Sequence, residues 1–167
     1  FDSIDINANS AWGNGLNQPL GWDQLSPLYE RNCVLSAHLE VEFAGAETST
    51  SASAVTTVGI SAAQGSSPFS GLDHLIEQPG SKWGLLATQN NVGTKKLVYH
   101  LDIGKFVGVD DIMDEATYHG TSTGNPSDSV FIIVGAQCFA AVQTRVRANM
   151  RLVQDVVFFQ RKAVALS

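Results

Sequence analysis

Alternation of apolar and polar residues over several long segments constrains this chain more than any other feature of its sequence. In residues 34–43, the apolar residues that share one side are Leu35, Ala37, Leu39, Val41 and Phe43. A period of two places successive side chains on opposite faces of a β-strand, so the segment predicts a strand with one buried face. The same test predicts strands at 54–61, 82–88, 96–103 and 145–161, and the doubly apolar segment 129–136 predicts a strand covered on both faces.

Helical signals are few and short. They allow one or two turns within 21–29 and 71–77, and one turn after Asp110. Six or more strands joined by loops of about ten residues predict an all-β, eight-stranded antiparallel jelly-roll sandwich with one or two short helices in its loops. We expect residues 1–167 to form this single domain. An immunoglobulin sandwich fits less well, because Cys33 and Cys138 are too far apart and no central Trp lies between them at the expected spacing.

The charge content is low for a chain of 167 residues. Charged residues make up 16%, against about 25% in an average soluble chain. With 10 Lys and Arg against 16 Asp and Glu, the net charge is −6, which by itself argues against a basic nucleic-acid-binding domain. No apolar run reaches the roughly 18 residues that span a bilayer, so we expect no membrane association. The two cysteines predict buried thiols, with a single disulfide as the alternative.

The most concentrated charge is an acidic cluster formed by Asp110, Asp111, Asp114 and Glu115. Four carboxylates so close together repel one another unless water or a hard cation separates them. The cluster lacks the ligand spacing of an EF-hand loop, so a solvated loop is the simpler interpretation. A Ca²⁺ ion shared between subunits is the alternative.

Basic residues gather near the C-terminal end, where Arg145, Arg147 and Arg151 share one face of a predicted strand. Such a row suits phosphate contacts that do not depend on base sequence. It equally suits ion pairs with Glu40 or Glu42 on a neighbouring strand, or a place in a subunit interface.

No catalytic motif is present. The four histidines form no H-x-x-x-H pair, no G-x-S-x-G elbow occurs, and no phosphate-binding or dinucleotide-binding glycine loop is found. We therefore expect a protein that is not an enzyme and requires no cofactor.

Several segments, in a fixed order, resemble one family. They are QPLGWDQLSPLY at 18–29, RNCVLS at 31–36, KKLVYHLDIGKFVG at 95–108 with the acidic run to Glu115, GNP at 124–126, and VQDVVFFQRK at 153–162. Together they look like the capsid proteins of small circular single-stranded DNA viruses that encode a replication initiator (CRESS-DNA viruses). These are related to the jelly-roll capsid proteins of satellite and tombusvirus-like viruses.

The resemblance implies a jelly-roll subunit that self-assembles into a small icosahedral shell, T=1 with about 60 copies, around a viral genome. It implies single-stranded DNA as that genome, contacted mainly by a basic N-terminal arm expected before Phe1, and a location in virions assembled in the host nucleus or cytoplasm. It also implies a host receptor, which the sequence does not identify.

In a shell subunit, tryptophans in loops or at strand ends suit contacts with a neighbour. Trp12, Trp22 and Trp83 are the candidates, and packing within the subunit's own core is the alternative for each. A different class of function also fits the sequence: a carbohydrate-binding, lectin-like jelly roll. In that hypothesis Trp22 and Trp83 stack on sugar rings and the acidic cluster holds Ca²⁺.

Overall fold

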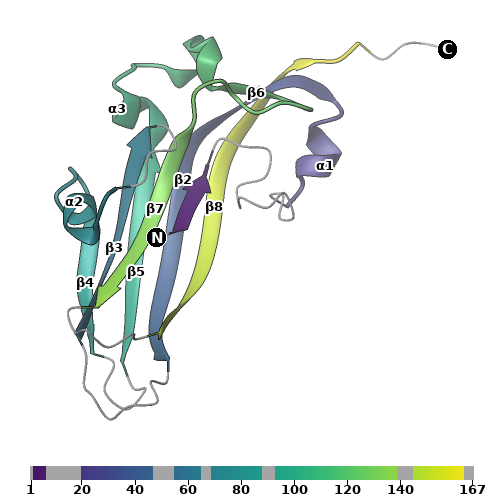
Figure 1. Cartoon of the computed structure of the whole chain (residues 1–167). Coiled ribbons are helices and arrows are strands. Elements are labelled where there is room, and N and C mark those ends of the chain that lie inside the picture. The colour runs from purple at the N-terminus through teal and green to yellow at the C-terminus, as the bar shows by residue number, and fades with distance from the viewer. Residues whose placement is uncertain are drawn as a thin grey trace.

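The protein folds as a sandwich of two antiparallel β-sheets (Figure 1). The computed structural model describes residues 2–6, 20–46, 55–64, 69–87, 93–138 and 145–163. Within these ranges, eight strands and a few short helices confirm the predicted all-β jelly-roll architecture. None of the helices there has the length and apolar character that a membrane crossing requires.

Sheet A contains four strands, which in spatial order are β1 (Asp2–Asp5), β7 (Val130–Cys138), β3 (Val55–Gln64) and β4 (Lys82–Ala87). Sheet B is built around β2 (Tyr29–Ala46). One edge of β2 pairs along its length with β8 (Arg145–Arg161), and the other edge pairs with β5 (Thr94–Asp102) and the short β6 (His119–Thr121). The chain passes between the two sheets several times, as a jelly roll requires.

The main core lies between the sheets. The inward side of β2 supplies Leu39, Val41 and Phe43, each at most 1% exposed, in the alternation that the sequence predicts. Sheet A faces them with Ile4, Val58, Ile60, Leu86, Ile132 and Val134. Because the side chains of a strand alternate, the polar residues of β2 point to the outer face of sheet B.

A second, smaller core lies on the outer face of sheet A. Here the helix α2 (Leu72–Ile76) packs Leu72 and Leu75 against Ile133 of β7. Gly59 of β3 makes this packing possible, because a Cβ at that position would lie 2.8 Å from Leu75 Cδ2. The prediction that 129–136 forms a strand covered on both faces is therefore confirmed: one face meets sheet B and the other meets α2.

The remaining helices lie in connections. They are α1 (Trp22–Leu25), α3 (Ile103–Val107) and the 3₁₀ turns η2 (Ile112–Asp114) and η3 (Ala116–Tyr118). Asp102 caps α3 by accepting a hydrogen bond from the backbone N–H of Lys105 at 3.2 Å, and Gly108 ends that helix with φ 81°. Three α-helices thus occupy the loops where the sequence predicts one or two.

The six predicted strands match β2, β3, β4, β5, β7 and β8, with boundaries that differ by a few residues. β1 and β6 were not predicted. They contain four and three residues, too few for an alternating pattern to stand out, and their pairing partners β7 and β2 are distant in sequence.

Candidate functional site

The outer face of sheet B carries a band of polar and charged side chains, called here the charged face. It comprises His38, Glu40 and Glu42 of β2, Lys96 and His100 of β5, and Arg147, Asn149 and Arg151 of β8. Pairing in the sheet brings them together: Glu40 lies directly opposite Arg151, and Glu42 lies opposite both Lys96 and Asn149. Long-range strand pairing therefore gathers residues from three separate parts of the chain.

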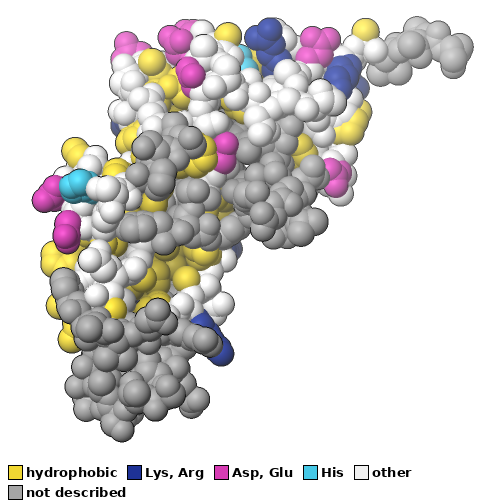
Figure 2. Space-filling view, viewed as in Figure 1, with side chains coloured by type: hydrophobic (Ala, Val, Ile, Leu, Met, Phe, Trp, Pro, Cys, Tyr) yellow, Lys and Arg dark blue, Asp and Glu magenta, His cyan; other side chains and the backbone are white. Residues whose placement is uncertain are grey.

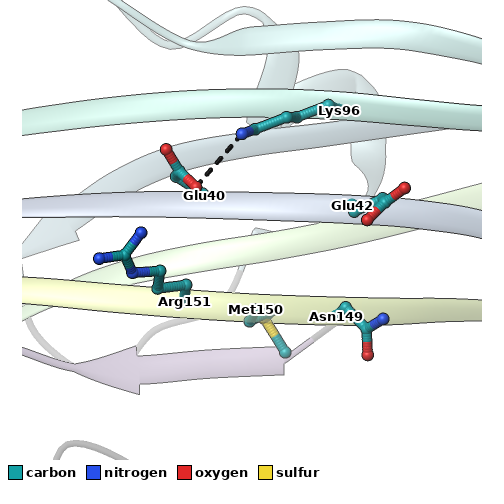
Figure 3. Close-up of a pocket in the computed structure, with 6 residues that line it drawn as sticks. All are labelled: Glu40, Glu42, Lys96, Asn149, Met150 and Arg151. Atoms are coloured by element: carbon teal, nitrogen blue, oxygen red, sulfur yellow. Dashed lines mark hydrogen bonds and ion pairs between the residues drawn. The ribbon is translucent and has the colours of Figure 1, made fainter.

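Glu40 is the electrostatic centre of this face. Lys96 Nζ lies 3.2 Å from Glu40 Oε2, as the dashed line in Figure 3 shows, and His38 Nε2 lies 3.7 Å from the other carboxylate oxygen. The hydrogen bond and positive charge of Lys96 lower the pKa of Glu40, with further contributions from His38 and Arg151. These groups are solvent-exposed, so screening limits what each pair contributes to stability.

A shallow pocket opens between these side chains. Its volume is about 190 Å³, and its lining residues are Glu40, Glu42, Lys96, Asn149, Met150 and Arg151 (Figure 3). This volume is below the roughly 300 Å³ at which pockets for ordinary small-molecule ligands begin. On its walls, Lys96 already forms an ion pair with Glu40. The geometry suits contact with another charged surface better than enclosure of a substrate.

The predicted arginine row is partly assembled. Arg147 and Arg151 are exposed and share the outer face of β8, as predicted. Arg151 lies opposite Glu40, one of the two partners that the ion-pair alternative names, and its positive charge helps to lower the pKa of Glu40, whereas Arg147 lies opposite Ala44. Arg145 pairs through its backbone with Ala46, and its side chain lies outside the described part of the structure. Of the two described side chains, Arg147 has no carboxylate directly opposite it on β2.

Two histidines meet on the same face. His38 and His100 are directly opposite each other on β2 and β5, and their ring centroids are 6.2 Å apart. His38 Nε2 also lies 3.7 Å from Glu40 Oε1, so this pair of rings adjoins the carboxylate at the centre of the charged face.

The acidic cluster is exposed, and one of its members has a structural role. Asp111 Oδ1 accepts a hydrogen bond from the backbone N–H of Met113 at 2.9 Å and so caps η2. Within the described ranges, no group of three or more potential ligands converges as a metal site would require. Calcium shared between subunits stays a prediction, and a second copy would have to supply further ligands.

The two described tryptophans differ sharply in their surroundings. Trp22 of α1 is 5% exposed, and its ring packs on Phe158 of β8 with centroids 5.3 Å apart. The core-packing alternative therefore fits Trp22, which has no exposed ring to offer a neighbour or a sugar, because α1 folds it onto the end of β8. Trp12 lies outside the described residues.

Trp83 is different, because it stands on an exposed apolar patch. Trp83 and Leu85 of β4 are 54% and 56% exposed, and Val55 of the adjacent β3 is 46% exposed. Pairing of Val55 with Ala87 places these side chains on the outer face of sheet A, where α2 covers the neighbouring residues but not these. Figure 2 shows apolar side chains gathered over β4, below α2. We call Val55, Trp83 and Leu85 the β4 patch.

Both cysteines are thiols, as predicted, but only Cys33 is buried; Cys138, at the end of β7, is partly exposed. Cys33 is buried, and burial raises the pKa of its thiol to about 11, with the charge of Asp111 acting in the same direction. The thiol is therefore protonated at neutral pH, which argues against a nucleophilic role.

Sequence reasoning missed two parts of these surfaces. The Lys96–Glu40 contact was not predicted, although both residues belong to segments predicted as strands. Val55 and Leu85 were not singled out, although alternation placed Leu85 two residues from Trp83. The missing information was which strands are neighbours.

No protein-family model matches this chain, and comparisons with curated proteins and with solved structures find no significant match.

Proposed function

We propose that this chain is a structural viral capsid protein that self-assembles into a small icosahedral shell around the viral genome. The proposed shell is a T=1 particle of about 60 copies, and the protein is not an enzyme. The observation that carries this proposal is the β4 patch: the adjacent strands β3 and β4 expose Val55, Trp83 and Leu85 on the outer face of sheet A.

An exposed cluster of large apolar side chains on a regular strand requires an explanation. Soluble monomers seldom leave such side chains together, and larger apolar patches rimmed by polar groups typically mark contact surfaces. Trp is enriched among the residues that dominate binding energy at interfaces. The low charge content of the chain, 16%, fits a subunit that must desolvate several surfaces when it assembles.

Genome contact is the second part of the proposal. Arg147 and Arg151 offer cationic groups on the charged face, although Glu40 partly neutralises Arg151. Two arginines on a chain of net charge −6 supply little attraction for a polyanion. We therefore propose that most contact with single-stranded DNA comes from a basic arm of the full-length protein, and that the protein resides in the virion.

A lectin-like function is the rival, favoured by one observation, the exposed indole of Trp83. Stacking on a sugar ring needs such a face. The second tryptophan in that hypothesis, Trp22, is occupied by Phe158 and does not contribute.

Particle formation by the purified full-length protein tests the proposal. We expect uniform closed particles by light scattering and negative-stain microscopy. Trp83→Ala should reduce their yield strongly, whereas Val98→Ala, at a valine that is 43% exposed on sheet B, should not. Protein that stays monomeric at all concentrations and salt conditions would contradict the shell. Glycan binding that is lost in Trp83→Ala would instead support the lectin hypothesis.

Calcium removal tests the remaining prediction for the acidic cluster. If Ca²⁺ bridges subunits through Asp110, Asp111, Asp114 and Glu115, chelation should lower the temperature at which particles dissociate. An unchanged dissociation temperature would remove calcium from the proposal while leaving the shell itself intact.

A further inference from the structure

β8 is an incompletely covered strand. Among the described strands it pairs only with β2, so its other edge has no strand partner in that part of the chain. Figure 1 shows it at the margin of the sandwich. Its inward side chains are also less covered than those of β2: Val146, Met150, Leu152 and Val156 pack on the core but are only partly buried, whereas Leu39 of β2 is fully buried.

The edge without a strand partner and the partly buried inward side chains could both be covered by the same added element. A further strand along this edge would pair with the backbone groups of β8 that no described strand contacts, and would cover the inward side chains of β8 at the same time. α1 limits where that strand can lie, because Trp22 packs on Phe158 near one end of β8. Among the described residues, this leaves the centre of the strand, residues 150–156, where the side chain of Gln154 donates a hydrogen bond to the backbone carbonyl of Ile6 at 2.6 Å.

The centre of β8 is complementary to itself. If two copies of β8 run antiparallel about a two-fold axis at Val153, that valine faces its own counterpart, and Arg151 faces the partner's Asp155. The symmetry creates the Arg–Asp pair twice. On the inward side, Met150 then faces the partner's Val156. Val153 is 45% exposed in the single subunit, so this contact would bury an apolar side chain that is now in water.

The charges on the outer face extend this match. Lys96, Glu40 and Arg151 already form a row of alternating sign across β5, β2 and β8. The partner's Asp155 would continue the row with the correct sign. Within each subunit, Ser36 Oγ donates a hydrogen bond to Asp155 Oδ2, which holds this carboxylate on the outer face beside the open edge.

We propose that two copies of this chain associate through the open edges of β8, antiparallel and centred on Val153, so that the two sheets B become one continuous sheet. This inference deepens the proposed function, since it rests on self-association and names one subunit contact of the assembly.

A cysteine at the symmetry axis tests the geometry directly. Opposed residues in an antiparallel pair have Cα atoms about 4.5–5.5 Å apart, which is within the range that a disulfide bridges. Val153→Cys should therefore form a covalent dimer under mild oxidation, seen on a non-reducing gel. Val98→Cys is the matched control, because Val98 is 43% exposed on the same sheet but lies on β5, on the opposite side of β2 from β8. Equal cross-linking of both variants would overturn the proposal.

A charge swap tests the register. Arg151→Glu and Asp155→Arg should each weaken association about tenfold in sedimentation measurements, since each places like charges opposite each other at two symmetric positions. The double variant restores both pairs and should return to within about threefold of the original protein. Arg147→Glu, outside residues 150–156, is the control for a general charge effect. Circular dichroism and thermal unfolding check that each variant folds.

The outcomes separate this contact from the shell. Closed particles in which Val153→Cys does not cross-link would overturn the β8 contact and leave the proposed function standing. Cross-linked dimers that never form closed particles would support the contact and contradict the shell. A double variant that associates no better than the single ones would overturn the proposed register and with it the proposal.

Discussion

The outer faces of the two sheets carry opposite kinds of side chain. The outer face of sheet A carries α2, whose Leu72 and Leu75 form a second apolar core with Ile133. The outer face of sheet B carries no helix over its central part among the described residues, and it exposes an ion-paired row around Glu40. Buried apolar side chains lie on the outer face of sheet A under α2, whereas solvated charged side chains lie on the outer face of sheet B.

This difference shows how local composition assigns roles to faces that share one architecture. β7 is apolar on both sides, so it needs a cover, and a single helical turn with two leucines supplies one where Gly59 allows a close approach. β2 alternates from Ala37 to Phe43, beyond a register shift between Val34 and Ser36, so the outer side of that part carries polar residues that remain in water. Among the described residues, the large apolar side chains that sheet A exposes are those of the β4 patch, which α2 does not cover.

The largest effect should come from the covered face. Leu75→Ala removes a fully buried side chain from the contact between α2 and sheet A, and we expect a loss of about 3–5 kcal/mol in the free energy of unfolding. Urea denaturation measures it. Val98→Ala, on the exposed face of sheet B, should change stability by less than about 0.5 kcal/mol. Equal losses would abolish the distinction between the two faces.

Substituting each of the two described tryptophans should distinguish a residue that stabilises the subunit from one that serves association. Trp22→Ala breaks the packing on Phe158 and should cost about 2–3 kcal/mol, less than a fully enclosed aromatic because α1 is one turn at the rim of the sandwich. Trp83→Ala should leave unfolding of the isolated subunit within about 1 kcal/mol of the original, because its ring is 54% exposed. Thermal unfolding of dilute protein compares them. A larger loss for Trp83→Ala would show that the β4 patch stabilises the subunit itself.

The smallest effect should appear on the charged face and only in acid. The pKa of Glu40 is lowered from its ordinary value of 4.5, mainly by the hydrogen bond from Lys96. A carboxylate with a lowered pKa in the folded state contributes stability above about pH 4.5, and this contribution is lost as the pH falls through the lowered pKa. The free energies of unfolding of Glu40→Gln and of the original protein should therefore differ more at pH 7 than at pH 3.

Chemical denaturation across this pH range provides the measurement. Glu42→Gln is the control, since Glu42 lies on the same face two residues away. If Glu40→Gln and the original protein lose stability in parallel between pH 7 and pH 3, the Lys96–Glu40 contact does not contribute.

Much of the fold was predictable, because alternation is a local property. The bounds predicted for β8, 145–161, coincide with the observed strand, and the doubly apolar character of 129–136 correctly indicated that β7 is covered on both faces. The short β1 and β6 were missed because each exists through pairing with a distant strand rather than through its own pattern.

The site was predictable only in part. The sequence placed Arg147 and Arg151 on one face and offered Glu40 as a partner, and pairing of β2 with β8 puts Arg151 opposite Glu40. It could not distinguish Trp22 from Trp83, since each lies next to a glycine near the start of a predicted element, and burial depends on what folds over each ring.

The sequence by itself determined the all-β class, the positions of the long strands and which of their faces are polar, because those properties depend on the spacing of residues along the chain. The tertiary structure alone decided which strands are neighbours, which of the two described tryptophans is exposed and which edge of β8 has no partner among the described strands. These depend on pairing between segments far apart in sequence, and the alternation that specifies a strand does not specify its partner.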